Sequence, residues 1–180
     1  LDHVEDVAPA LTKTLSDLQL DYLDLYLMHW PVALKEGVYF TESLDDILPP
    51  EAVPISKTWE AMEALASKGL CRHIGVSNFS VVKLQQLLGT ARIKPEMNQI
   101  ELHPYLQQPA MLDFCNKHRI HLTAYAPLGS SGRPDFVETD EPSVLEHPTI
   151  VRIADRRKAT TAQGCSRRMV RRSIATSNSR

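Results

Sequence analysis

Apolar residues recur at helical spacing near the start of the chain. Between residues 4 and 20 the sequence VEDVAPALTKTLSDLQL places apolar side chains three or four positions apart. The positions that carry this pattern are Val7, Leu11, Leu15 and Leu18. The stretch predicts an amphipathic helix, and the apolar run from Tyr26 to Met28 that follows it predicts a strand.

A second amphipathic segment comes after a long, irregular connection. Residues 33–55 contain Pro49, Pro50 and Pro54, too many breakers for a regular element. The next segment, SKTWEAMEALASKG, predicts a helix with Ser56 as its N-cap and Gly69 as its C-terminal stop. Its apolar face consists of Trp59, Met62, Leu65 and Ala66.

Strands and helices then alternate regularly. Strands are predicted at residues 73–79, 96–102 and 121–128. The predicted helices cover residues 80–91 with Ser80 as N-cap, residues 109–119 opened by Pro109, and residues 143–159 with an interruption at Pro148. This alternation indicates an α/β fold with a parallel sheet and helices outside it. Doubly wound sheets and barrels both show it, and neither GxGxxG nor a GxxxxGKS/T phosphate loop occurs.

Polar side chains stand where four successive strands end. They are His29, Ser77 with Asn78, Gln99, and Tyr125. In a (β/α)8 barrel the chemistry lies at the C-terminal ends of the strands. One histidine at a strand end is most simply a core or capping residue, and one glutamine or tyrosine an ordinary buried side chain. Four such ends in succession are hard to explain by packing alone, so the pattern favours a functional site.

The composition is that of an ordinary globular protein, with 43% hydrophobic and 23% charged residues. No apolar run is long enough to span a bilayer, and the N-terminus lacks a signal-peptide pattern, so no membrane partner is expected. The three cysteines (Cys71, Cys115, Cys165) are odd in number and suit the reduced thiols of a cytoplasmic protein. None has metal-ligand spacing to another, and no metal site is expected.

The net charge of −2 is unevenly distributed. Residues 164–180 contain five arginines and no acid, which leaves 15 basic and 22 acidic residues elsewhere. The acidic body argues against nucleic acid as a partner. The arginine-rich tail could contact RNA or an anionic membrane, but no aromatic residue lies among its arginines to stack on a base. We therefore interpret residues 164–180 as a disordered Arg/Ser-rich tail.

Four stretches, taken together, resemble the aldo-keto reductase family of NAD(P)H-dependent carbonyl reductases. They are DLYLMHWP, GLCRHIGVSNF, PEMNQIELHPYLQQ and LTAYAPLGS, and the likeness covers about residues 1–163. The resemblance implies a (β/α)8 TIM barrel, of which about four βα units are present here. It also implies NADP(H) as cofactor and aldehydes or ketones as small-molecule substrates, although the choice of NADP(H) over NAD(H) comes from the family alone.

The resemblance also implies roles for particular residues. His29 matches the catalytic histidine, and Trp30 a side chain of the substrate pocket. Ser77, Asn78 and Gln99 match the side chains that hold the nicotinamide carboxamide, Tyr125 the ring that stacks on the nicotinamide, and Leu128 and Ser130 the loop along the pyrophosphate. Residues 33–55 match a variable substrate loop. Ala126 occupies a place where the family often has serine.

Two departures from the family pattern limit what is expected of the chain. Of the family's catalytic Asp, Tyr, Lys and His only His29 is matched, because the other three precede the histidine strand. We therefore expect no catalysis by this chain, and either low stability or self-association through unpaired strand edges.

After residue 163 the likeness stops, which suggests a change of reading frame or splice junction near Gly164. A non-catalytic nicotinamide-binding or regulatory subunit, or an interaction module using the basic tail, remain as alternatives.

Overall fold

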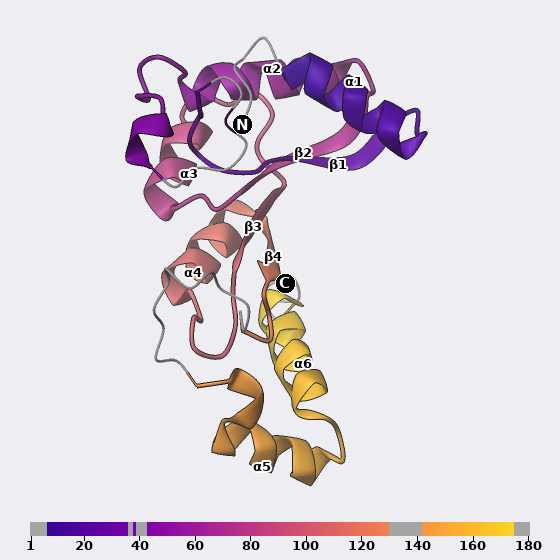
Figure 1. Cartoon of the computed structure of the whole chain (residues 1–180), viewed down its shortest axis with the longest axis vertical. Coiled ribbons are helices and arrows are strands. Elements are labelled where there is room, and N and C mark those ends of the chain that lie inside the picture. The colour runs from indigo at the N-terminus through magenta and orange to yellow at the C-terminus, as the bar shows by residue number, and fades with distance from the viewer. Residues whose placement is uncertain (1–6, 36–37, 39–42, 130–141, 175–180) are drawn as a thin grey trace. The chain divides into compact units, whose positions relative to one another are not determined.

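The elements alternate as the sequence predicts. The computed structural model describes residues 7–35, 38, 43–129 and 142–174, with side chains up to residue 167. In chain order the elements are α1 (Val7–Leu18), β1 (Leu23–Met28), the 3-10 helix η2 (Leu44–Asp46), α2 (Ile55–Ser67), β2 (Cys71–Ser77), α3 (Val81–Leu88), β3 (Met97–Glu101), α4 (Pro109–His118), β4 (His121–Tyr125), the 3-10 helix η3 (Val144–Glu146), α5 (Pro148–Arg157) and α6 (Thr161–Ile174) (Figure 1).

The order of the strands distinguishes the two folds that the alternation leaves open. The four strands are neighbours in the order β1-β2-β3-β4. β1 and β2 run parallel, with Leu23 opposite Cys71 and Met28 opposite Val76. A doubly wound sheet needs a point where the strand order reverses, and no reversal occurs among these four strands. Since βα crossovers are right-handed, helices of such a sheet lie on one face, as in a barrel.

The chain divides into two compact units, residues 1–98 and 99–180. In the first unit α1 packs on α2, and α2 packs on β2 (Figure 1). Trp59, Met62 and Ile74 are fully buried between these elements, and the indole Nε1 of Trp59 donates to the Ile93 carbonyl at 2.9 Å. The apolar face predicted for residues 56–69 is thus the face that covers the sheet.

Helix boundaries in the first unit agree with the sequence at two of three predicted caps. The Ser80 hydroxyl accepts from the Lys83 amide at 3.3 Å and caps α3. Gly69 follows α2 with a φ of +75°, a left-handed conformation that favours glycine. The prediction of Ser56 as N-cap was wrong, because α2 begins at Ile55 after Pro54, and no side chain caps it. Proline with its φ near −60° is already suited to begin a helix.

The second unit confirms one expectation and corrects another. The helical pattern of residues 143–159 is interrupted at Pro148: η3 ends at Glu146, and α5 begins at Pro148, where the missing N–H costs nothing and His147 caps the helix. The expectation of a disordered tail from residue 164 was wrong over residues 164–174, since α6 begins at Thr161 and runs through them.

A capping box explains why α6 forms. The Thr160 hydroxyl accepts from the Gln163 amide at 3.1 Å, and the Gln163 side chain accepts from the Thr160 amide at 3.0 Å. Cys165 then lies fully buried with Val144 and Ile150. None of the helices described is both long and apolar enough to cross a membrane.

Candidate functional site

The C-terminal ends of β1 and β2 bring three of the predicted site residues together. His29 directly follows β1, and Ser77 is the last residue of β2. Parallel pairing of Met28 with Val76 sets the two strand ends at one edge of the sheet. The Asn78 Nδ2 donates to the His29 carbonyl at 3.0 Å and to the Ser77 Oγ at 3.2 Å. The Asn78 carboxamide thus links the Ser77 hydroxyl to the backbone of His29.

Local backbone geometry makes this group accessible. Asn78 has a φ of 61°, in the left-handed region that asparagine tolerates better than most residues. The sharp turn ends β2 and lets α3 begin at Val81. Ser77 is 3% exposed, whereas His29 is exposed. The histidine ring can therefore meet a ligand, while the buried serine hydroxyl takes part in the network through Asn78.

Gln99 and Tyr125 belong to the second unit. Tyr125 is the last residue of β4, as predicted, but the expectation that Gln99 stands at a strand end was wrong, because it lies in the middle of β3. The Leu102 amide donates to the Tyr125 carbonyl at 3.3 Å, which fixes the neighbouring strand ends of this unit relative to each other. Both side chains are half-buried.

The two residues predicted for a pyrophosphate loop have different outcomes. Leu128 is half-buried and packs against the cluster of Val144, Ile150 and Cys165. This packing gives the Leu128 side chain a structural role in the second unit. Ser130 lies outside the described residues.

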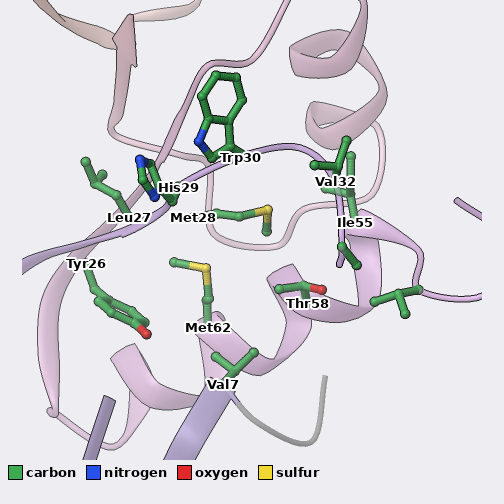
Figure 2. Close-up of a pocket in the computed structure, with 12 residues that line it drawn as sticks. Val7, Tyr26, Leu27, Met28, His29, Trp30, Val32, Ile55, Thr58 and Met62 are labelled. Carbon is green, nitrogen blue, oxygen red and sulfur yellow. The ribbon is translucent and has the colours of Figure 1, made fainter. Parts of the chain in front are cut away.

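A cavity of about 260 Å³ lies beside His29 and Trp30 in the first unit (Figure 2). Its lining residues are Val7, Tyr26, Leu27, Met28, His29, Trp30, Val32, Ala33, Val53, Ile55, Thr58 and Met62. Successive residues of a strand point to opposite faces, so Tyr26 and Met28 line it from one face of β1, and Leu27 from the other. β1 is the end strand of the four. The cavity therefore lies along β1, the end strand among the described residues.

Trp30 stands between this cavity and solvent. Its side chain is 44% exposed, and its ring centroid lies 6.0 Å from that of His29 with 44° between the ring planes. Figure 2 shows the two rings on neighbouring positions of the chain just beyond β1. A large, exposed aromatic ring beside an accessible imidazole is a suitable wall for a small organic ligand.

The described residues offer little for other kinds of chemistry. No group of three or more His, Cys, Asp or Glu side chains within them is arranged to hold a metal ion. All three cysteines are free and buried. Burial raises the pKa of the Cys115 thiol to about 12, and it also raises the pKa of Cys71 and Cys165. A thiolate nucleophile is therefore not favoured.

Two contacts of the first unit have no counterpart in the sequence prediction. The Lys83 ammonium donates to the Pro31 carbonyl at 3.3 Å. The buried Glu63 carboxylate accepts from the amides of Arg92 and Ile93. Neither contact has a periodic or motif signal, because each joins positions far apart in the sequence. The Thr160–Gln163 capping box, in contrast, is a local signal that was available in TTAQ.

Comparison with known proteins identifies the family. The sequence model described as "Aldo/keto reductase family" matches residues 2–177. The chain belongs to this family. Its four strands with their helices are consequently part of a (β/α)8 TIM barrel fold. The match continues past Gly164 to residue 177, so the expected loss of family likeness at residue 163 was wrong.

Relatives from distant organisms cover nearly the whole chain. An aldo/keto reductase, slr0942, of Synechocystis sp. (strain ATCC 27184 / PCC 6803 / Kazusa) is 53% identical over 165 residues, 91% of this chain and 49% of the relative. Aldo-keto reductase family 1 member A1 is 44% identical over 175 residues in Gallus gallus (97% of this chain) and 42% over 173 residues in Homo sapiens (96%), with 53% of each relative covered. The chain spans about half the length of the curated relatives it matches.

Proposed function

We propose that this chain carries the histidine and the nicotinamide-binding strand ends of an NADP(H)-dependent aldo-keto reductase that reduces aldehydes and ketones to alcohols. The observation that supports the proposal best is the hydrogen bond from Asn78 to the His29 carbonyl at the edge where β1 and β2 end. The bond joins the residue matched to catalysis with the pair matched to cofactor binding.

The side chains have the chemistry that a nicotinamide requires. A carboxamide has one acceptor oxygen and an NH₂ group, and hydroxyl and amide side chains such as Ser77, Asn78 and Gln99 can meet both. The phenol ring of Tyr125 is suited to stack on a flat heteroaromatic ring. The loop with Leu128 and Ser130 would follow the pyrophosphate. The cofactor supplies the hydride, and these residues supply orientation.

In this proposal His29 interacts with the substrate. A neutral imidazole that donates a hydrogen bond to the substrate oxygen would hold the carbonyl in place and stabilise the charge that develops on it. The exposed His29 ring is accessible for this bond, and Trp30 beside it would line the substrate pocket. Among the family's four catalytic side chains only His29 is matched, so we expect the 180 residues alone to bind cofactor without turnover.

The same proposal covers location and partners. Three free, buried thiols fit a reducing compartment, and we propose a cytoplasmic protein on that ground. β1 is the end strand among the four described strands, and an end strand favours association with another strand, including that of a second copy. A non-catalytic nicotinamide-binding subunit is the second candidate, favoured because most of the matched side chains belong to the cofactor site and not to catalysis.

Titration of the 180-residue chain with NADPH tests the proposal. Nicotinamide fluorescence and tryptophan quenching should saturate, and Tyr125→Ala should weaken binding by roughly threefold to tenfold because a stacking partner is lost. Tyr22→Ala is the matched control: Tyr22 lies at the opposite end of β1 under the Arg72 guanidinium, and its removal should leave binding unchanged. Parallel titration with NADH measures the preference for the 2′-phosphate.

The outcomes separate the candidates. Absence of saturable binding by a chain that unfolds cooperatively in urea would refute the proposal. Binding followed by aldehyde reduction would contradict the expected lack of turnover. Binding without reduction would agree with the proposal that these strand ends hold the cofactor. The reductase and the non-catalytic subunit would then be distinguished by repeating the reduction assay on a chain that includes the residues that the family places before the histidine strand.

A further inference from the structure

The backbone of residues 29–31 leaves the sheet and obtains its hydrogen bonds from side chains. β1 ends at Met28, so the carbonyls that follow have no strand partner in the ladder. The His29 carbonyl accepts from the Asn78 Nδ2 at 3.0 Å, and the carbonyl of the buried Pro31 accepts from the Lys83 ammonium at 3.3 Å. Trp30 lies between the two anchored residues.

Lys83 lies at a helix position where a lysine does not stabilise the helix. It is the third residue of α3, where the partial positive charge of the helix end disfavours a cation. Its side chain is half-buried, and its own amide is fixed by the Ser80 cap. A charged side chain directed at a backbone carbonyl makes a stronger bond than a neutral donor would. The contact with Pro31 therefore accounts for the lysine better than the helix does.

We infer that Lys83 is a positioning residue that fixes the Trp30 side chain through the Pro31 carbonyl and so shapes the substrate pocket. The inference rests on the proposed function in so far as Trp30 lines that pocket. Asn78 bonds the backbone at residue 29 and Lys83 bonds it at residue 31, so the backbone is anchored on both sides of Trp30. The fixed Pro31 also sets where the connection of residues 33–55 begins, including the bridge between Leu34 and Ile47.

The test is made on the full 180-residue chain with Lys83→Met, which keeps an apolar stem and removes the ammonium. Both tryptophans are labelled with 5-fluorotryptophan, and the two fluorine resonances are assigned with Trp30→Phe. The Trp30 resonance should shift toward that of a solvated indole, while Trp59, buried and bonded to the Ile93 carbonyl, should not move. Exchange of the Lys35 amide, which donates to the Asp46 carbonyl, should accelerate about tenfold.

Two further variants make the test specific. Lys83→Arg retains a charged donor and should restore the Trp30 resonance and the slow exchange. Lys57→Met is the matched control, because Lys57 is also the third residue of a helix in the same unit and its ammonium forms an ion pair with the exposed Glu60. It should change neither observable.

An unchanged Trp30 resonance in Lys83→Met would overturn the inference. So would an equal acceleration at Lys35 and at Leu84, an amide within α3, because that result shows a general loss of stability. Neither the Trp30 resonance nor the Lys35 exchange requires cofactor. If the proposed function fails, the parent chain will not bind NADPH, but the effects of Lys83→Met will still be observed.

Discussion

The Glu63 carboxylate is predicted to stabilise the first unit through two backbone amides more than through its ion pair. Glu63 is 2% exposed, and its Oε1 accepts from the amides of Arg92 at 2.7 Å and Ile93 at 2.8 Å. The Arg92 Nε donates to the other oxygen at 2.8 Å, but the Arg92 side chain is 75% exposed. The carboxylate thus joins α2 to the turn before β3.

The contacts predict an order for three substitutions. Glu63→Ala leaves two buried amides without an acceptor and should lower the free energy of unfolding by about 3–5 kcal/mol. Glu63→Gln can keep Oε1 for both amides but turns an NH₂ group toward Arg92, and should cost about 2 kcal/mol. Arg92→Ala removes only a solvated partner and should cost less than about 1 kcal/mol.

The pKa of Glu63 adds a pH dependence with a definite sign. Burial raises this pKa, but hydrogen bonds from the Ile93 amide, the Arg92 side chain and the Arg92 amide, with the charge of Arg92, lower it more. The net pKa lies below the ordinary value for glutamate. The stabilisation is therefore complete above the unfolded-state pKa and is lost as the pH falls through the lowered folded-state pKa.

Urea denaturation followed by tryptophan fluorescence, repeated between pH 7 and acid pH, measures both effects. Glu60→Gln serves as the control, because Glu60 is an exposed neighbour that pairs with Lys57. The free energy of unfolding of Glu63→Gln should vary less with pH than that of the parent chain. If Arg92→Ala proves as costly as Glu63→Ala, or if Glu63→Gln keeps the parent's pH dependence, the reasoning is refuted.

Two further substitutions test local features of the fold. Gly75→Ala should destabilise the chain by roughly 2–3 kcal/mol in urea denaturation, since the new Cβ would lie 2.7 Å from both the Leu27 Cδ2 and the Met97 carbonyl oxygen. A smaller loss of stability than that of Gly89→Ala, at an exposed glycine, would contradict this. Thr160→Ala should remove half of the capping box and destabilise α6 by about 1 kcal/mol, seen as lower helicity by circular dichroism, whereas Thr160→Ser should retain it; equal helicity in both variants would exclude the cap as the cause.

Most helices and strands could be predicted from the sequence because their signals are local. The spacing of Trp59, Met62 and Leu65 marks the face of α2 that is buried, and Ser80 and Gly69 mark helix ends within one turn. The wrong interpretation of residues 164–174 came from composition, since the arginines obscured a capping box that lies just before them. Family membership was also recoverable, because four characteristic stretches stand along the chain in the order that the family has.

The sequence by itself determined which segments become strands and that His29, Ser77 and Tyr125 stand at or directly after strand ends. Only the tertiary structure decided the order β1-β2-β3-β4 and which of those strand ends are bonded to each other. Asn78 reaches the His29 carbonyl across 49 positions, and Lys83 reaches the Pro31 carbonyl across 52. Such contacts depend on strand register and helix packing, which many residues set jointly, so no local pattern encodes them.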